Sequence, residues 1–342
     1  MRMWFRPVKG IAFCIVAAFF GSQAMAQVQV KRSFPSAKRI SAFDNTTFCT
    51  AFLSDGSLLT IRDIPIVDLR DVDKIAFNPT GSSLALMRGK KPVSIYSFRD
   101  RNKKLFELKE QRKSKELKGR KNLNFFVPGP VGAELMKDAS KGDIVPVAMC
   151  YGADARNFLV SNSLGEIIVY DTKAYLPQAY IQGKAVATAI TMSPNNYFIA
   201  AGTGKNIDIW NFQTKELRTS LPMPAEVTEL VFSADASQMA VVTADKRLTI
   251  FDTKTWDKVD IFDKIGGTLT SPSFHPDGKY ISVVKDGNAI VIMNLKNSVP
   301  EQTLDENPGG VTGSRFFVNK QTSDVFMLSN APKDLCSGML MV

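Results

Sequence analysis

The chain has 342 residues and a formal net charge of +10 at pH 7, with 44% hydrophobic and 22% charged residues. This length allows a large core, built either as one repeat array or as two domains, and the composition is that of a soluble globular protein. The chain has a single histidine, which argues against catalysis or zinc binding that depends on several of them.

The first 26 residues have the layout of a secretory signal peptide. Arg2, Arg6 and Lys9 precede an apolar run at 10–20, and small residues near 24–26 provide a cleavage motif. We expect cleavage after Ala26, export to the periplasm or the cell surface, and no transmembrane span in the mature chain; an uncleaved membrane anchor is the alternative. Cleavage lowers the net charge from +10 to +7, and residues 99–121, with eleven basic and four acidic side chains, account for that +7.

Two early segments predict strands joined by tight turns. The stretches AFLSDGSLLTI (51–61) and AFNPTGSSLAL (76–86) each place a glycine-containing turn between apolar runs. VSIYS (93–97) adds a strand after the second of them, and we expect Lys104–Leu108 to be the outer strand of the same group.

A segment at about 109–143 follows and repeats nowhere else; we call it the basic insertion. Its first part (KEQRKSKELKGRK) is polar and basic, and its second part (LNFFVPGPVGAEL) is apolar and broken by proline and glycine. Long loops inside regular repeats are usually functional or disordered, so this segment is the best candidate for partner binding, with a solvated loop as the alternative. The candidate partner-binding residues are Arg112, Lys113, Lys115, Lys118, Arg120, Lys121, Phe125 and Phe126.

The next four copies of the repeat are the clearest. Each has an apolar segment that ends in a polar residue: IIVYD (167–171), IDIWN (207–211), LTIFD (248–252) and IVIMN (290–294). The residues thirteen positions before these ends, Phe158, Phe198, Met239 and Ile281, are 40, 41 and 42 positions apart. Strands that are apolar on both faces are typical of burial between packed sheets.

The copy at 272–294 shows the turn chemistry. Pro-Asp-Gly at 276–278 precedes a strand at Tyr280–Val284, Asp-Gly-Asn at 286–288 turns the chain, and Ala289–Asn294 returns as a second strand. Downstream, SRFFVN (314–319), DVFML (324–328) and GMLMV (338–342) predict further strands.

A repeat of about 40 residues with several short strands is typical of a β-propeller blade. The stretches AITMSPNNYFIAAGTGKNIDIWN and LVFSADASQMAVVTADKRLTIFD resemble the second half of WD40-type propeller repeats, and FHPDGKYISVV is also similar to the Pro-Asp repeats of TolB-like propellers. The Gly-His pair of the WD40 family is missing. Its Trp-Asp pair appears as Trp210-Asn211, Phe251-Asp252 and Tyr170-Asp171.

The resemblance implies an all-β fold with one propeller domain over residues 27–342. We expect seven blades, with six or eight as the alternatives, and a ring closed by an N-terminal strand such as Arg39–Phe43. Of the cysteines left after cleavage, Cys49 and Cys336 lie in the first and last repeats, where closure would bring them together. A disulfide between them and free thiols are both open, because an odd number of cysteines does not make a disulfide framework.

Two motifs that suggest chemistry are better explained by blade structure. His275 occupies the repeat position of Ser193 and Ser233, which favours a turn residue over a catalytic base. The stretch Gly202–Lys205 lacks the upstream glycine and the following serine or threonine of a phosphate-binding loop, so a hairpin turn is expected.

Two further groups have the same structural explanation. The group Asp68, Asp71 and Asp73 lacks the spacing of a calcium loop, which favours a solvated turn. Trp210 and Trp256 fall at strand ends, which favours packing within the blades over ligand stacking.

The pattern as a whole predicts a non-enzymatic scaffold that needs no cofactor. We expect it to bind another protein through the basic insertion, with an anionic envelope surface as a further partner and no nucleic acid. Glycan or small-molecule binding in the propeller channel, and a propeller hydrolase or lyase, are the alternative functions.

Overall fold

A computed structural model describes residues 14–16, 50–52, 58–60, 73–80, 82–97, 104–108, 144–262, 265–304, 311, 313–318, 325–330 and 338–341. The regular elements in these ranges are β-strands. No helix in them is long and apolar enough to cross a membrane.

Five four-stranded antiparallel sheets follow one another along the chain, each with its strands side by side in sequence order. The first sheet has β4 (Lys74–Phe77), β5 (Ser83–Met87), β6 (Val93–Ser97) and β7 (Lys104–Leu108). The second has β8 (Pro146–Tyr151), β9 (Asn157–Asn162), β10 (Glu166–Asp171) and β11 (Pro177–Gln182). The third has β12 (Ala189–Met192), β13 (Phe198–Thr203), β14 (Asn206–Asn211) and β15 (Leu217–Pro222). The fourth has β16 (Val227–Phe232), β17 (Gln238–Thr243), β18 (Leu248–Asp252) and β19 (Lys258–Ile261). The fifth has β20 (Leu269–Phe274), β21 (Tyr280–Lys285), β22 (Ala289–Asn294) and β23 (Val299–Leu304).

The remaining strands lie towards the two ends of the chain. β24 (Gly313–Val318), β25 (Val325–Asn330) and β26 (Gly338–Met341) pair antiparallel, and β1 (Cys14–Val16) pairs with β26 in parallel. β2 (Thr50–Phe52) and β3 (Leu58–Thr60) form a separate two-stranded hairpin.

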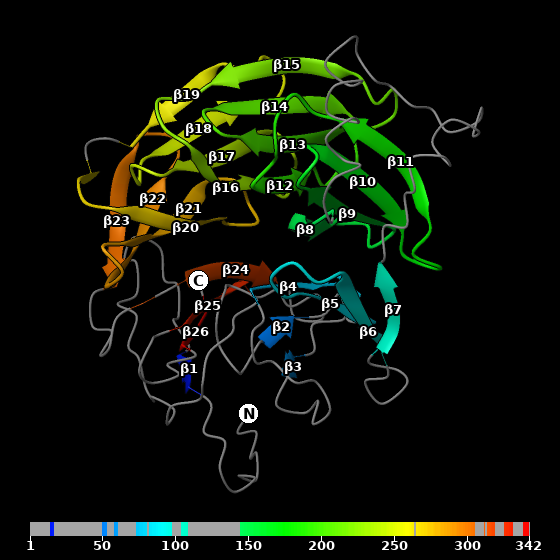
Figure 1. Cartoon of the computed structure of the whole chain (residues 1–342). Helices are drawn as coiled ribbons and strands as arrows, with labels where there is room; N and C mark the ends of the chain where they lie inside the picture. Colours follow the sequence, from blue (N-terminus) through cyan, green and yellow to red (C-terminus); the bar gives the residue numbers. More distant parts are fainter. Residues whose placement is uncertain are drawn as a thin grey trace, which may run out of the picture.

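The sheets are arranged around a common centre (Figure 1). The first strand of each sheet, which we call the inner strand, lies nearest the middle, and the fourth, the outer strand, lies at the periphery. Neighbouring inner strands contact one another in the order β4, β8, β12, β16, β20 and β24. This arrangement is that of β-propeller blades.

Hydrophobic cores lie between successive sheets rather than within one of them. The third and fourth sheets share one core, and the fourth and fifth share the next. Alternate residues of β17 serve both: Met239 and Val241 face the third sheet, whereas Ala240 and Val242 face the fifth. Because successive side chains of a strand point to opposite faces, a middle strand of such a sheet must be apolar at every position.

The repeat read from the sequence is confirmed in the strand register. Phe198 pairs with Asn211, and Ile281 pairs with Met293 next to the polar strand end at Asn294. A register shift recurs in all five sheets where the third strand meets the fourth, for example between Ile209 and Trp210. The outer strand predicted at Lys104–Leu108 is β7, and the turn at Asp286 and Gly287 has positive φ at both residues.

The predicted closing strand, Arg39–Phe43, lies outside the described residues, as do Cys49 and Cys336. The strand that pairs in parallel with β26, on the side away from β25, is β1, which falls within the predicted signal peptide. In a chain cleaved after Ala26 this pairing would be lost.

Candidate functional site

The arrangement of sheets as a whole has two distinct faces, at which the strands begin and end. Inner strands begin and outer strands end on one face, which also carries the turns between second and third strands; we call it the connection face. Backbone hydrogen bonds join successive sheets there: Val227 N–H donates to Gly204 O over 2.9 Å, and Leu269 N–H donates to Lys246 O over 2.9 Å. The turns between first and second strands, and between third and fourth, lie on the opposite face.

The described strands that flank the basic insertion in the sequence meet the connection face, since β7 ends there and β8 begins there. The insertion follows β7, an outer strand, in the sequence and precedes β8, the inner strand of the next sheet. The predicted contact residues Arg112, Lys113, Lys115, Lys118, Arg120, Lys121, Phe125 and Phe126 all lie outside the described residues.

His275 is confirmed as a turn residue on the opposite face. Its N–H donates to Tyr280 O over 2.8 Å, and Ser193 and Ser233 make the equivalent bond to the residue five positions later. The His275 side chain is buried, with Nδ1 2.6 Å from an oxygen of Asp277. Ser193 Oγ and Ser233 Oγ likewise donate to Asn195 and Asp235, two positions on. The imidazole of His275 therefore takes the place of the serine hydroxyl in this turn. It contacts the residue two positions on and stabilises the loop between the first and second strands of its sheet.

The stretch Gly202–Lys205 is confirmed as a hairpin between β13 and β14. Gly204 has a φ of +64°, which favours glycine, and a Cβ added to Gly202 would lie 2.7 Å from Cγ1 of Val227 in the next sheet. Backbone conformation and packing thus explain why glycine occupies both positions. Of the three aspartates, Asp73 accepts a hydrogen bond from Gly89 N–H in the β5–β6 turn, whereas Asp68 and Asp71 lie outside the described part of the chain.

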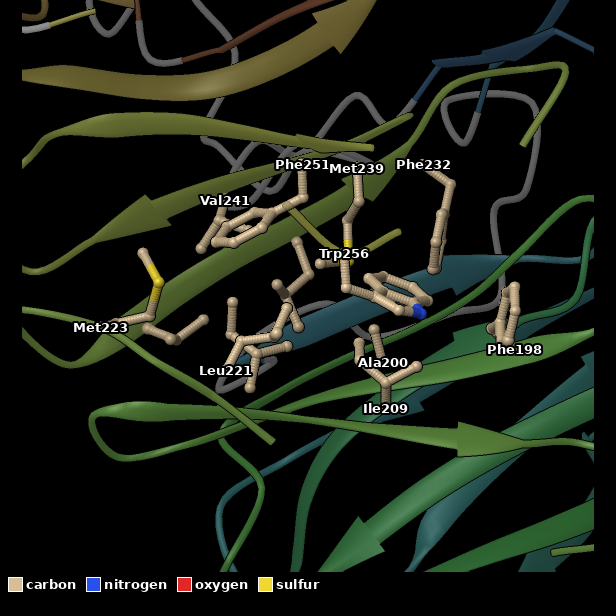
Figure 2. Close-up of a cluster of buried hydrophobic side chains, with 13 residues drawn as sticks. Phe198, Ala200, Ile209, Leu221, Met223, Phe232, Met239, Val241, Phe251 and Trp256 are labelled. Carbon is tan, nitrogen blue, oxygen red and sulfur yellow. The ribbon is translucent and has the colours of Figure 1, made fainter. Parts of the chain in front are cut away.

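Both tryptophans of the repeat region are buried in the cores between sheets, as predicted. Trp210 belongs to the core shared by the second and third sheets. Trp256 belongs to the next core, where its ring meets Phe198 edge-on at 5.1 Å (Figure 2). Its Nε1 is buried and has no hydrogen-bond partner among the described residues, and Figure 2 shows this atom at the end of the indole nearest to Phe198.

A buried group of three hydroxyls escaped the sequence analysis. Tyr175 Oη lies 2.8 Å from Ser83 Oγ and 2.9 Å from Tyr151 Oη, which joins the first and second sheets. Burial raises the pKa of both tyrosines. The repeat held a signal for this group, because Tyr175 and Trp256 both lie four positions after the polar strand end, and both have positive φ.

Polar groups of the inner strands tie the sheets together. Lys74 Nζ on β4 donates to Val147 O over 3.1 Å and to Thr188 O over 3.3 Å, thereby linking three sheets. Glu229 on β16 accepts the N–H of Ser271 on β20 at 3.1 and 3.2 Å from its two oxygens. The Lys74 and Glu229 side chains thus stabilise the contacts between neighbouring blades. In the described ranges, no three His, Cys, Asp or Glu side chains come together in a way that could hold a metal ion.

Charge is unevenly distributed on the connection face. In the described turns and connections of the first three sheets, the basic residues are Arg88, Lys90, Lys91, Lys184 and Lys205, and the acidic residues are Asp73 and Glu226, the latter in the connection from β15 to β16. The described turns of the fourth and fifth sheets instead balance Lys246 and Arg247 with Asp245 and Asp286. The end of β7 and the start of β8, which flank the basic insertion in the sequence, therefore lie in the part of the connection face whose described turns are most basic.

Comparisons with known proteins give a distant and partial similarity. No protein-family model matches the chain. It is 24% identical over 152 residues to "Periodic tryptophan protein 2 homolog" of Schizosaccharomyces pombe, which is 44% of this chain and 18% of the relative. It is 29% identical over 132 residues to the Dictyostelium discoideum protein of the same name, which is 32% of this chain and 14% of that relative.

The chain thus spans less than a fifth of the length of these curated relatives. Periodic tryptophan protein 2 is a WD40 protein, and the repeated four-stranded sheets are consistent with propeller blades. Together they support a WD40-like β-propeller, a fold that typically serves as a scaffold for protein interactions.

Proposed function

We propose that this protein is a non-enzymatic propeller scaffold that binds another protein through its connection face. The observation that carries the proposal is topological: the long segment that breaks the repeat lies in the sequence between β7 and β8, and these strands end and begin on the face whose neighbouring turns are basic. The blades would hold this face rigid, and loops held on a rigid scaffold are the usual place for binding residues.

The insertion has the composition of a two-part docking element. Its basic residues, among them Lys113, Lys118 and Arg120, would attract an acidic partner over a distance of about 8–10 Å at physiological salt. Phe125 and Phe126 would then bury apolar surface at the contact, since aromatic side chains are enriched at the centres of interfaces.

Charge removal in the insertion should slow association. A variant with Lys113, Lys115, Lys118, Arg120 and Lys121 all changed to glutamine should bind its partner more slowly, and the dependence of the association rate on salt should become flatter. The partner would first be captured from the source cell with and without residues 109–143, and the rates then measured on the purified pair.

A matched control removes the same charge from the opposite face. Arg156, Lys173, Lys254, Lys279 and Lys296 are exposed in its turns, and their change to glutamine should leave the association rate unaltered. Equal rates for the insertion variant and the wild type would reject the insertion as the docking element.

We also propose that the protein is exported and acts in the periplasm or at the cell surface, where an anionic envelope surface would be a further partner. The proposal rests on the basic, apolar and small-residue order of residues 1–26. The mass of the protein recovered from its source should correspond to a chain that starts at Gln27. A full-length mass, or recovery with the cytosolic fraction, would contradict export.

A further inference from the structure

Four lysines on the connection face have no ion-pair partner among the described residues. Lys90 and Lys91 lie in the β5–β6 turn, Lys184 lies in the connection from β11 to β12, and Lys205 lies in the β13–β14 turn. All four are exposed. They come from three successive sheets whose inner strands contact one another, so they form one sector of the face rather than scattered charges.

The described acidic residues of this sector are Asp73 and Glu226. Glu226 is exposed in the connection from β15 to β16, where Met223 N–H donates to Lys205 O over 2.8 Å. Asp73 accepts a hydrogen bond from Gly89 N–H and thereby holds the turn that carries Lys90 and Lys91. In the fourth sheet, by contrast, Arg247 Nε lies 3.4 Å from an oxygen of Asp245 in its own turn. The described turns of the first three sheets therefore keep an excess of positive charge, in which an anionic ligand would meet four exposed ammonium groups, with the carboxylate of Glu226 near the Lys205 end.

The chemistry of these turns favours an acidic protein segment over nucleic acid. Proteins that bind single-stranded nucleic acid interleave basic residues with aromatic side chains on which the bases stack. The turns at 88–92, 163–165, 183–188 and 204–205 contain no aromatic residue. Carboxylates need only exposed ammonium groups at matching spacing.

Spacing fits an extended peptide. Packed sheets lie about 10 Å apart, so turns of three successive sheets span about 20 Å. An extended chain advances about 3.3 Å per residue and covers this distance with about six to eight residues.

We infer that Lys90, Lys91, Lys184 and Lys205 form a second docking sector of the connection face, which binds an extended acidic segment of a partner protein. The inference rests on the proposed function as a protein-binding scaffold, but it uses none of the residues of the basic insertion. It assigns the partner a chemistry, a run of Asp or Glu side chains, and a site, the turns of the first three sheets.

The test uses the full mature chain and a fluorescent peptide of about twelve glutamates, which exceeds the expected span. Changing the four lysines to glutamine should weaken peptide binding about tenfold or more at low salt, since each exposed pair contributes modestly. The matched control changes Lys173, Lys254, Lys279 and Lys296, four exposed lysines of the opposite face, and should bind the peptide like the wild type. Far-ultraviolet circular dichroism would show that both variants are folded.

Several outcomes would overturn the inference. Equal weakening in both variants would mean that net charge alone attracts the peptide, and unchanged binding in both would remove the sector. Tighter binding of a single-stranded RNA of the same length, or of phosphatidylglycerol vesicles, with loss in the four-lysine variant, would assign the sector to another class of ligand.

A parallel measurement separates this inference from the proposed function. The glutamine variant of the basic insertion should keep most of its peptide binding if the sector acts independently. Loss of peptide binding in that variant alone would overturn the sector while leaving the insertion as the docking element. Failure to capture any partner from the source cell would count against the proposed function, whereas the peptide titration would still decide the sector.

Discussion

Replacing Trp256 by alanine should lower the free energy of unfolding by about 3–5 kcal/mol, the range for removing a buried aromatic side chain. Trp256 is 8% exposed and belongs to the core shared by the third and fourth sheets. Its ring meets Phe198 of the third sheet at 5.1 Å, although it is carried by a turn of the fourth. Alanine would therefore leave a cavity between two sheets rather than within one. Urea denaturation followed by circular dichroism would measure the loss.

Two further substitutions at Trp256 separate packing from backbone strain. Phenylalanine keeps most of the ring volume and removes the unpartnered Nε1, so it should cost only about 1–2 kcal/mol. Glycine suits the φ of +64° at this position, so the glycine variant should be no less stable than the alanine variant. An alanine variant as stable as the wild type would show that the indole does not hold the two sheets together.

Strand positions were predictable because the repeat fixes them several times over. Phe158, Phe198, Met239 and Ile281 mark the same place in successive sheets, and the polar residue that ends each third strand has a local cause. Asp171, for example, accepts hydrogen bonds from the N–H groups of Lys173 and Ala174, so it ends the strand and caps the turn. The polar residue is therefore expected at the same place in each repeat whose third strand ends in such a turn.

Side-chain contacts between sheets were harder to predict. Tyr175 and Ser83 are 92 positions apart, and their hydrogen bond depends on how two blades pack rather than on any local pattern. The same holds for Lys74, which reaches a carbonyl oxygen on β8 and another in the connection from β11 to β12. These residues look like ordinary turn or strand-end positions until the sheets are placed side by side.

The candidate site was predictable only in part for the same reason. The basic insertion was identified because it does not repeat, which needs no structure. Lys90, Lys184 and Lys205 each resemble a solvated turn residue in the sequence. Only the alternation of strand direction places them on the same face as the end of β7 and the start of β8, between which the insertion lies in the sequence. A charge pattern spread over three repeats becomes visible once each turn is assigned to a face.

The thiol of Cys150 should react with iodoacetamide at least 100-fold more slowly in the folded protein than in the unfolded chain at pH 8. Cys150 lies on β8 and packs against the core shared by the second and third sheets. Burial raises the pKa of its thiol from 9.0 to about 12, and a backbone hydrogen bond with Met192 opposes part of that rise. Because only the thiolate is nucleophilic, a rise of this size lowers the reactive fraction about 1000-fold, and partial exposure of the side chain reduces the effect.

Alkylation followed by mass spectrometry of the peptide that contains Cys150 would measure this rate in buffer and in concentrated urea. A variant with Gln178→Cys on the exposed part of β11 provides the matched control, since its thiol should react at similar rates in both states.

The raised pKa of Cys150 also predicts how the stability of the protein depends on pH. The folded state holds the proton more tightly, so this contribution is complete below pH 9 and is lost as pH rises from about 9 to about 12. Cys150→Ala should therefore flatten the fall in stability over that range. In the alkylation experiment, equal rates for Cys150 and the control thiol in the folded protein would contradict the burial of Cys150 between the sheets.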